Sequence, residues 1–140
     1  MENALIPGLP AALVLAALAC TTTTESTRKD SMKALDPKFR KILCIGDSIT
    51  DGNTYPALLR QALAEAGYAP PVVVNAGIAG ETSGQILARL DDDLKHKPTF
   101  ITILAGANDM GQRRAPAEEY GKNMRAIAER IAKAGIPPMR

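Results

Sequence analysis

Short apolar runs alternate with amphipathic stretches through the part of the chain that follows residue 40. The runs cover residues 42–45, 72–74 and 100–104, and each is apolar nearly throughout rather than at every second position. Continuous apolar runs of this length are typical of parallel strands that are covered by helices on both faces. The pattern predicts an α/β domain in which βαβ units build a parallel sheet between two helical layers.

Each run leads into a stretch with helical character. The predicted helices cover residues 56–66, ending at Gly67, residues 83–94, and residues 116–134, ending at Gly135. In the last helix large apolar side chains recur at three- and four-residue spacing, at Tyr120, Met124, Ile127 and Ile131. Because this spacing places them on one helix face, we expect a stripe of core residues rather than a binding feature.

The first 40 residues do not follow this pattern. Residues 9–19 form a short apolar run that ends at Cys20, and a tract of threonines opens the polar stretch 21–40. This layout indicates an export signal over residues 1–20 and a linker over residues 21–40, followed by one domain over residues 41–140. The apolar run is shorter than the roughly 20 residues that a membrane-spanning helix needs.

Residues 17–20 resemble the cleavage box of bacterial lipoproteins, in which the cysteine is lipidated. Ala17 stands where leucine is usual, and Glu2 precedes the apolar run without any Lys or Arg, whereas signals normally begin with positive charge. Two interpretations therefore stay open. Either Cys20 is lipidated and attaches an envelope, periplasmic or secreted protein to a membrane, or translation starts at Met32 and the protein is cytoplasmic.

The composition and the distribution of charge exclude several classes of function. The 17 basic and 15 acidic residues are interspersed, and the three tyrosines and two phenylalanines are scattered, so neither a nucleic-acid groove nor a stacking platform is indicated. Cys20 and Cys44 lie in very different contexts, which argues against a disulfide, and no His or Cys spacing suits a metal. We expect no nucleic-acid partner and no cofactor.

Glycine and polar residues follow each of the three predicted strands, at residues 46–48, 75–80 and 106–109. In an open parallel sheet, ligands bind at the carboxyl edge, where these turns lie. A single Gly-Asp-Ser turn would be weak evidence, because all three residues are common in turns. Three such turns after consecutive strands predict a functional site at this edge.

The three turns are similar to the conserved blocks of the SGNH or GDSL hydrolases, a family of serine esterases and lipases, in its lysophospholipase and arylesterase-like branch. Residues 41–52 resemble the first block, with Ile49 in place of the commoner leucine, while residues 74–82 and 103–109 resemble the second and third. The resemblance covers residues 41 to about 134. It implies a flavodoxin-like, three-layer α/β/α fold, present here as the N-terminal portion and truncated after the third strand and its helix.

The resemblance also implies roles. Ser48 would be the nucleophile of a carboxylic ester hydrolase that forms an acyl-enzyme. The negative charge that builds on the carbonyl oxygen would be held by the backbone N–H groups of Ser48 and Gly80 and by the side-chain amide of Asn108. Glycine suits a backbone donor that must approach the substrate closely, and an amide donates without titrating. The substrate would be a small-molecule, lipid or carbohydrate ester.

Other polar residues of these turns are interpreted as structural. Asp47 and Asp109 are expected to hold turns through hydrogen bonds to backbone N–H groups, and Asn75 to tie the second turn to the first. Asp51 and Thr54 are expected to cap the helix that follows the first turn, and Asn53 is expected to shape the loop before it.

The chain has one histidine, His96. Residues 93–96 reproduce the Asp-x-x-His spacing of the family's catalytic pair, but they precede the third strand, whereas the family's pair follows the last strand. A parallel sheet places His96 and Ser48 at opposite edges, about 16 Å apart for five residues at roughly 3.3 Å each. A working base must come within about 3 Å of the nucleophile. We therefore expect His96 to be a surface residue and this chain alone to be inactive.

Three interpretations of the function follow. The first is an ester hydrolase, seen as an incomplete domain without its catalytic Asp and His. The second is a non-catalytic envelope lipoprotein, or a degenerate member of the family, that binds a glycan or lipid. The third, a nucleotide-binding protein, is disfavoured because residues 46–52 match neither Gly-x-Gly-x-x-Gly nor the phosphate loop. An α/β-hydrolase elbow is also disfavoured, since it needs glycine where Thr50 stands.

Overall fold

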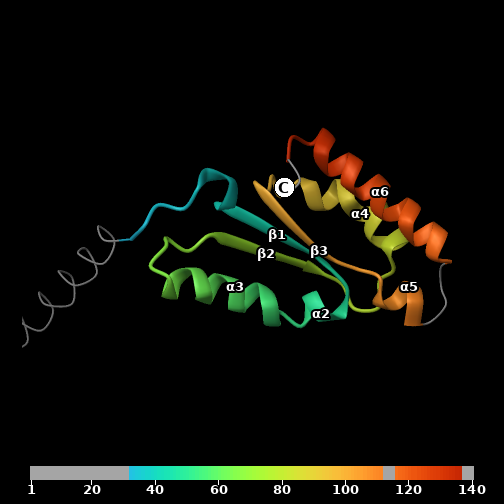
Figure 1. The fold of residues 1–140 in the computed structure, drawn as a ribbon, viewed down its shortest axis with the longest axis horizontal. Coiled ribbons are helices and arrows are strands. Elements are labelled where there is room, and N and C mark those ends of the chain that lie inside the picture. The colour runs from blue at the N-terminus through green and yellow to red at the C-terminus, as the bar shows by residue number, and fades with distance from the viewer. Residues whose placement is uncertain (1–31, 112–115, 137–140) are drawn as a thin grey trace, which may run out of the picture. The chain divides into compact units, whose positions relative to one another are not determined.

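The computed structural model describes residues 32–111 and 116–136, and an α/β unit begins at Ala34 (Figure 1). The predicted signal, Cys20 and most of the predicted linker lie outside the described residues. Within the described ranges no helix combines the length and the apolar character that crossing a membrane requires.

Three parallel strands form the sheet. β1 (Lys41–Gly46) lies in the centre, with β2 (Val72–Gly77) on one side and β3 (Phe100–Leu104) on the other. Gly46 pairs in register with Gly77 and with Leu104, so all three strands end at the same level. The predicted parallel sheet is confirmed. β2 continues three residues further than predicted, because its ladder with β1 extends to Gly77.

Helices cover both faces of this sheet, which confirms the three layers. Figure 1 shows α2 (Ser48–Asp51) and α3 (Thr54–Glu65) on one face, and α4 (Ser83–Leu94) and α6 (Ala117–Lys133) on the other. The buried apolar cluster between the sheet and the second pair of helices consists of Leu43, Ile45, Ile86, Leu90 and Ile127. Each such side chain contributes about 1.5–3 kcal/mol when fully buried.

The predicted stripe on α6 belongs to this core. Ile127 is fully buried, and Met124 and Ile131 pack against the same cluster. The fourth member, Tyr120, lies closer to the sheet edge, where its hydroxyl donates to the carbonyl oxygen of Ala105 at 3.3 Å. The helical spacing thus identified the face that packs on the sheet.

The helix ends follow local rules, with one exception. Gly67 and Gly135, which follow the ends of α3 and α6, have φ values of 82° and 81°, as expected of glycine at helix ends. α3 begins two residues earlier than predicted, and its N-cap is Asn53, whose side chain makes no capping bond. The expected caps, Asp51 and Thr54, are therefore wrong. Asn53 shapes the loop instead through its left-handed backbone, with φ of 55°, which asparagine tolerates.

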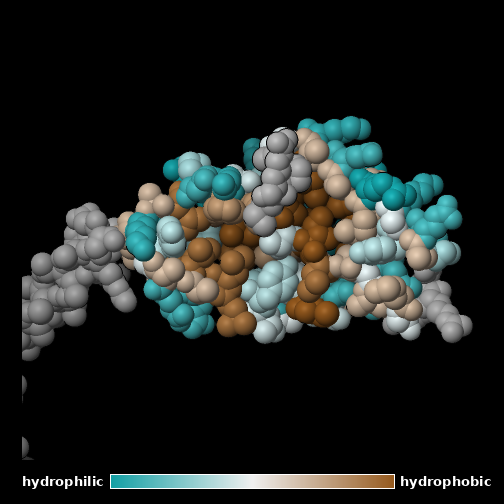
Figure 2. Space-filling model, viewed as in Figure 1, coloured by the Kyte–Doolittle hydropathy of each residue, from teal (hydrophilic) through white to brown (hydrophobic). Residues whose placement is uncertain are grey.

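Two short helices and the outer strand complete the unit. α5 (Ala107–Gly111) follows β3, and the 3-10 helix η1 (Pro37–Phe39) precedes β1. β3 is only half-buried, and its last residue, Leu104, is 42% exposed. Figure 2 shows apolar side chains gathered between the helical layers on the face turned toward the viewer. From this apolar surface we expect the chain alone to be poorly soluble.

Candidate active site

Ser48 is the first residue of α2, directly beyond the carboxyl end of β1. Ser48 is exposed to solvent, whereas the preceding Asp47 is only 1% exposed. The Asp47 carboxylate caps the helix by accepting from the backbone N–H of Ile49 at 3.1 Å. The first N–H groups of a helix have no intrahelical acceptor, so the Ser48 N–H is suited to bind an external oxygen. The expected structural role of Asp47 is confirmed.

The second turn is tied to the first by Asn75. Its side-chain amide donates to the carbonyl oxygen of Asp51 at 3.3 Å, and its side-chain oxygen accepts from the N–H of Gly77 at 2.9 Å. A backbone bond of 3.0 Å from the Ile78 N–H to the Gly46 carbonyl joins the same two turns. The predicted tie between the turns is therefore confirmed.

Gly80 lies in the loop between β2 and α4. Its φ of 82° is in the left-handed region, which strains most residues that carry a Cβ. A Cβ at this position would meet no atom within 4 Å. The loop therefore requires glycine for its backbone conformation. A close approach of the substrate at Gly80, the reason expected from the sequence, stays a prediction.

Asn108 lies on α5, after β3, and is half-buried. Its side-chain nitrogen donates to the carbonyl oxygen of Glu81 at 2.9 Å, which joins the third turn to the loop that carries Gly80. An amide nitrogen carries two hydrogens, and this bond uses one of them. The bond orients the amide, as an oxyanion donor must be oriented before reaction.

Asp109 is fully buried, and its carboxylate binds outside its own turn, within which its partner was expected. Its carboxylate accepts from the backbone N–H of Ser83 at 2.9 Å and from the Ser83 hydroxyl at 2.6 Å, and Asn123 on α6 donates to the same hydroxyl at 3.1 Å. Asp109 thus bonds to a backbone N–H, as predicted. That N–H belongs to the start of α4, 26 residues away, and not to the turn of Asp109 itself.

The strand ends pack so tightly against α2 that glycine is required there. A Cβ on Gly77 would overlap the backbone nitrogen of Asp51, and backbone atoms cannot move aside easily. We expect Gly77→Ala to lower the free energy of unfolding by about 1–3 kcal/mol or more, measured by urea denaturation. Gly111→Ala is the matched control, because a Cβ there meets nothing within 4 Å. Equal stability of the two variants would contradict this packing.

His96 lies at the amino edge of the sheet. It follows α4 and is exposed, and its backbone N–H donates to the Asp93 carbonyl at 3.1 Å. The register pairs Ile42 with Phe100 and Gly46 with Leu104, so residues before β3 and after β1 lie at opposite ends of the strands. The structure does not bring His96 to Ser48.

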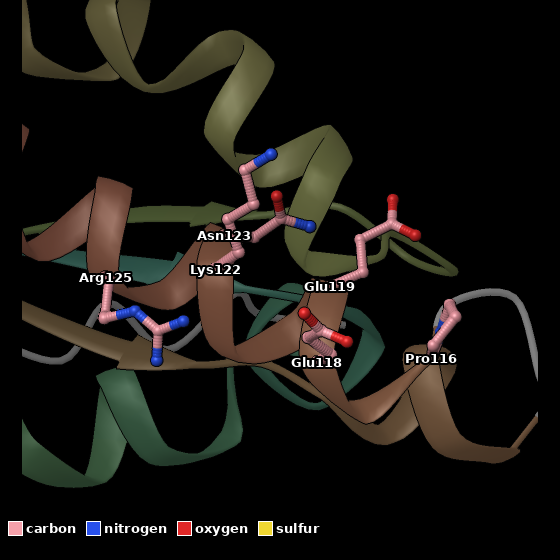
Figure 3. A pocket seen from close by; sticks show the side chains of 6 residues that line it. All are labelled: Pro116, Glu118, Glu119, Lys122, Asn123 and Arg125. Atoms are coloured by element: carbon pink, nitrogen blue, oxygen red, sulfur yellow. The ribbon is translucent and has the colours of Figure 1, made fainter.

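A hollow of about 430 Å³ runs along the first turns of α6 (Figure 3). Its lining is mostly polar and charged, and consists of Pro116, Glu118, Glu119, Lys122, Asn123 and Arg125. These side chains spread along the helix rather than converge on one point, and none of the three predicted site residues is among them. This hollow is therefore not the predicted ester site.

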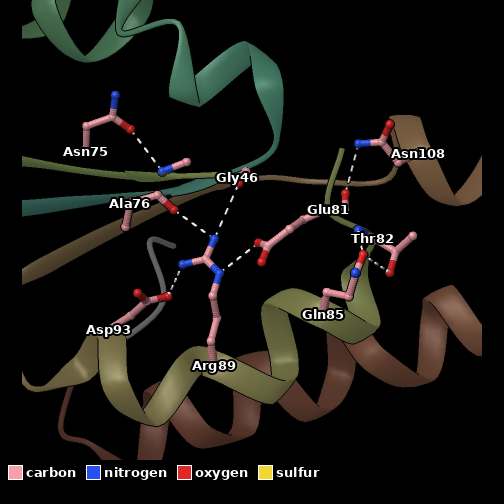
Figure 4. A network of polar contacts seen from close by, with 10 residues as sticks. Gly46, Asn75, Ala76, Glu81, Thr82, Gln85, Arg89, Asp93 and Asn108 are labelled. Atoms are coloured by element: carbon pink, nitrogen blue, oxygen red, sulfur yellow. Dashed lines mark hydrogen bonds and ion pairs between the residues drawn. The ribbon is translucent and has the colours of Figure 1, made fainter. Parts of the chain in front are cut away.

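Arg89, which was not predicted from the sequence, is the centre of a polar network beneath the site (Figure 4). Its guanidinium contacts the carboxylates of Glu81 and Asp93 and donates to backbone carbonyls at the ends of β1 and β2. Burial raises the pKa of the Asp93 carboxyl above its ordinary value, and the charge of Arg89 opposes this shift. Only the four-residue spacing of Arg89 and Asp93 on α4 is visible in the sequence.

The comparisons with known proteins agree with this arrangement. Residues 44–140 match the family model described as the GDSL-like Lipase/Acylhydrolase family. An arylesterase from Vibrio mimicus is 34% identical over 111 residues, which are 74% of this chain and 54% of the relative. Esterase TesA from Pseudomonas aeruginosa is 37% identical over 101 residues, 67% of this chain and 49% of the relative.

A solved structure leads to the same family. The crystal structure of AlinE4, an SGNH-hydrolase family esterase, superposes with a TM-score of 0.64 at 32% identity, covering 70% of this chain and 56% of that one. The predicted SGNH hydrolase fold is thereby confirmed, and the chain spans about half the length of the curated relatives it matches. The family match covers well over half of the chain. This chain therefore belongs to the GDSL-like lipase/acylhydrolase family.

Proposed function

We propose that Ser48 is the nucleophile of a carboxylic ester hydrolase, with the oxyanion held by the N–H groups of Ser48 and Gly80 and the amide of Asn108. The observation that carries this proposal is the common level at which the three strands end, which brings their following turns to one edge. The bond from Asn108 to the carbonyl of Glu81, the residue after Gly80, then connects the two proposed donors Asn108 and Gly80.

The reaction would follow the usual course of acyl transfer. The Ser48 hydroxyl oxygen attacks the ester carbonyl carbon while its proton passes to a general base, and the carbonyl oxygen becomes an oxyanion. The carbon–oxygen bond to the alcohol then breaks, and the alcohol leaves with the proton. Water attacks the acyl-enzyme in the same way, which releases the acid and restores the Ser48 hydroxyl.

The general base of this reaction would come from a segment outside these 140 residues. His96 supports this view, because it is the single histidine of the chain and lies at the opposite edge of the sheet from Ser48. A histidine oriented by a carboxylate is the usual base for a serine nucleophile. The 140-residue chain by itself would then have little or no activity.

An apolar group on the substrate is favoured by the surroundings of the proposed site. Three large apolar side chains lie within two residues of Ser48, Gly80 and Asn108 and are largely exposed, namely Ile49 (55%), Ile78 (47%) and Met110 (72%). Exposed apolar groups beside a site indicate a surface for an apolar ligand. We propose that they contact the acyl chain of the ester.

This contact predicts a preference for longer acyl chains. Burying a methylene contributes about 0.8 kcal/mol, so partial burial of four more methylenes should raise kcat/KM by roughly tenfold from p-nitrophenyl acetate to the hexanoate. Met110→Ser should reduce this ratio and leave acetate hydrolysis nearly unchanged. Leu58→Ser, which removes an apolar side chain that is 56% exposed on α3, is the control and should leave the ratio unchanged. Equal ratios in all three proteins would refute the contact.

The experiment that tests the function begins with the gene. The genomic DNA beyond the codon for Arg140 is sequenced in all three forward frames, and the protein that it encodes is assayed with p-nitrophenyl acetate. We expect an Asp-x-x-His segment downstream and hydrolysis that depends on Ser48. A stop codon with no such segment, together with a stable inactive product, would favour the non-catalytic binding protein instead. The named relatives are esterases, which supports the ester hydrolase over the binding protein.

A further inference from the structure

Arg89 reaches the carboxyl ends of two strands from beneath the proposed site. Its Nη2 donates to the carbonyl oxygen of Ala76 at 2.8 Å and lies 3.4 Å from that of Gly46 (Figure 4). Gly46 stands two residues before Ser48. The side chain of Arg89 is only 17% exposed, so its guanidinium depends on partners within the protein rather than on water.

The same guanidinium holds two carboxylates. Its Nε donates to Glu81 Oε2 at 2.7 Å and its Nη1 to Asp93 Oδ2 at 2.5 Å, and these carboxylate side chains are 13% and 12% exposed. Four acceptors therefore surround one planar group. Arginine suits such a site because its donors point in several fixed directions, whereas a lysine presents its donors from one nitrogen.

Glu81 connects this network to the proposed oxyanion donors. Its carboxylate bonds to Arg89, while its backbone carbonyl accepts from the Asn108 amide at 2.9 Å. Glu81 also directly follows Gly80, and its N–H donates to the Ile78 carbonyl at 3.3 Å, which closes the turn around Gly80. Glu81 thus joins Arg89 to Gly80 and to Asn108, the two proposed donors that lie outside the first turn.

We propose that Arg89 is a positioning residue that sets the loop of residues 77–82, so that the Gly80 N–H and the Asn108 amide converge with the Ser48 N–H on one oxygen. This inference rests on the proposed ester hydrolysis. Arg89 acts through Glu81 on one side and through the strand ends on the other, without touching the substrate. Its effect belongs to the transition state, because only there does the oxygen carry the charge that the donors bind.

The test is Arg89→Lys in the protein as its gene encodes it. Misplacing a catalytic group by about 1 Å can cost on the order of a hundredfold. We expect kcat for p-nitrophenyl acetate to fall by about 10- to 100-fold while KM changes by less than about threefold, because the lost interaction forms in the transition state. The rate is expressed per active site, titrated with the phosphate triester diethyl p-nitrophenyl phosphate.

Arg130→Lys is the matched control. Arg130 on α6 also bonds to one carbonyl and one carboxylate, those of Leu87 and Asp91, at 3.2 Å and 3.4 Å. Both of these partners lie on α4 rather than in the loop of residues 77–82, so this variant should keep the wild-type kcat. Should Arg89→Lys fail to fold, Glu81→Gln keeps the shape of that side chain, removes its charge and should lower kcat per titrated site in the same direction.

Each outcome bears on a different claim. A wild-type protein that hydrolyses no ester, or a Ser48→Ala variant as active as the wild type, overturns the ester hydrolase and the role of Arg89 with it. An active wild type whose Arg89→Lys and Glu81→Gln variants keep kcat per titrated site overturns the positioning role alone. Activity lost only in proportion to the titrated fraction also overturns it, since Arg89 would then serve folding and nothing more.

Discussion

Ser48→Ala should reduce kcat for p-nitrophenyl acetate by about 10⁶-fold. Without the hydroxyl oxygen no acyl-enzyme can form, and losing the nucleophile of a serine hydrolase costs roughly this factor. The measurement is steady-state hydrolysis by the protein as its gene encodes it. Because Ser48 is exposed, the variant should keep the wild-type unfolding temperature.

Thr99→Val is the matched control for the loss of a hydroxyl. The Thr99 hydroxyl accepts from the N–H of Lys41 at 2.9 Å, at the amino edge of the sheet, opposite the proposed site. This variant should lose some stability and retain the wild-type kcat. If Ser48→Ala keeps more than about 1% of the activity, Ser48 is not the nucleophile, because a covalent mechanism cannot survive its removal to that extent.

Asn108→Ala should lower kcat by about 10²- to 10³-fold with little change in KM, because it removes one donor to the oxyanion. The variant also removes the bond to the Glu81 carbonyl, so the loop that carries Gly80 loses one of its ties. Asn108→Asp should be at least as inactive, since a carboxylate donates no hydrogen bond and adds negative charge beside the oxyanion. Steady-state kinetics with p-nitrophenyl acetate measure both variants.

Gln61→Ala serves as the control for Asn108. Gln61 carries the same amide group on the exposed side of α3, where it donates to Glu65 at 2.7 Å. Its removal should leave kcat and KM at the wild-type values. An Asn108→Ala variant that behaves like Gln61→Ala would show that this amide is not an oxyanion donor.

The sheet and its helices could be predicted because their signals are local. The continuous apolar run of β1, the spacing of the α6 stripe and the glycines after α3 and α6 depend on neighbours within a few residues. The structure confirms them, with α4 at the predicted bounds. The short helices α2 and α5 were missed. Helices of this length are unstable alone and carry no periodicity to detect, so tertiary contacts stabilise them here.

The site was only partly predictable. A parallel sheet brings the turns after its strands to one edge, and the observed register places the strand ends level. Within those turns, Ser48, Gly80 and Asn108 were selected by the resemblance to the SGNH hydrolases. Their catalytic roles stay predictions. The partner of Asp109 could not be foreseen, because Ser83 stands 26 residues away and becomes its neighbour only when α4 packs beside α5.

The amino-acid sequence by itself determined the parallel α/β architecture, the face of α6 that packs on the sheet and the edge at which a site could form, because apolar spacing and turn residues act over short distances. Tertiary structure alone decided that Arg89 binds the ends of two strands and that Asn108 bonds to the Glu81 carbonyl. These bonds join residues 13 to 43 positions apart. Such contacts depend on how whole elements pack together, and no local pattern records that packing.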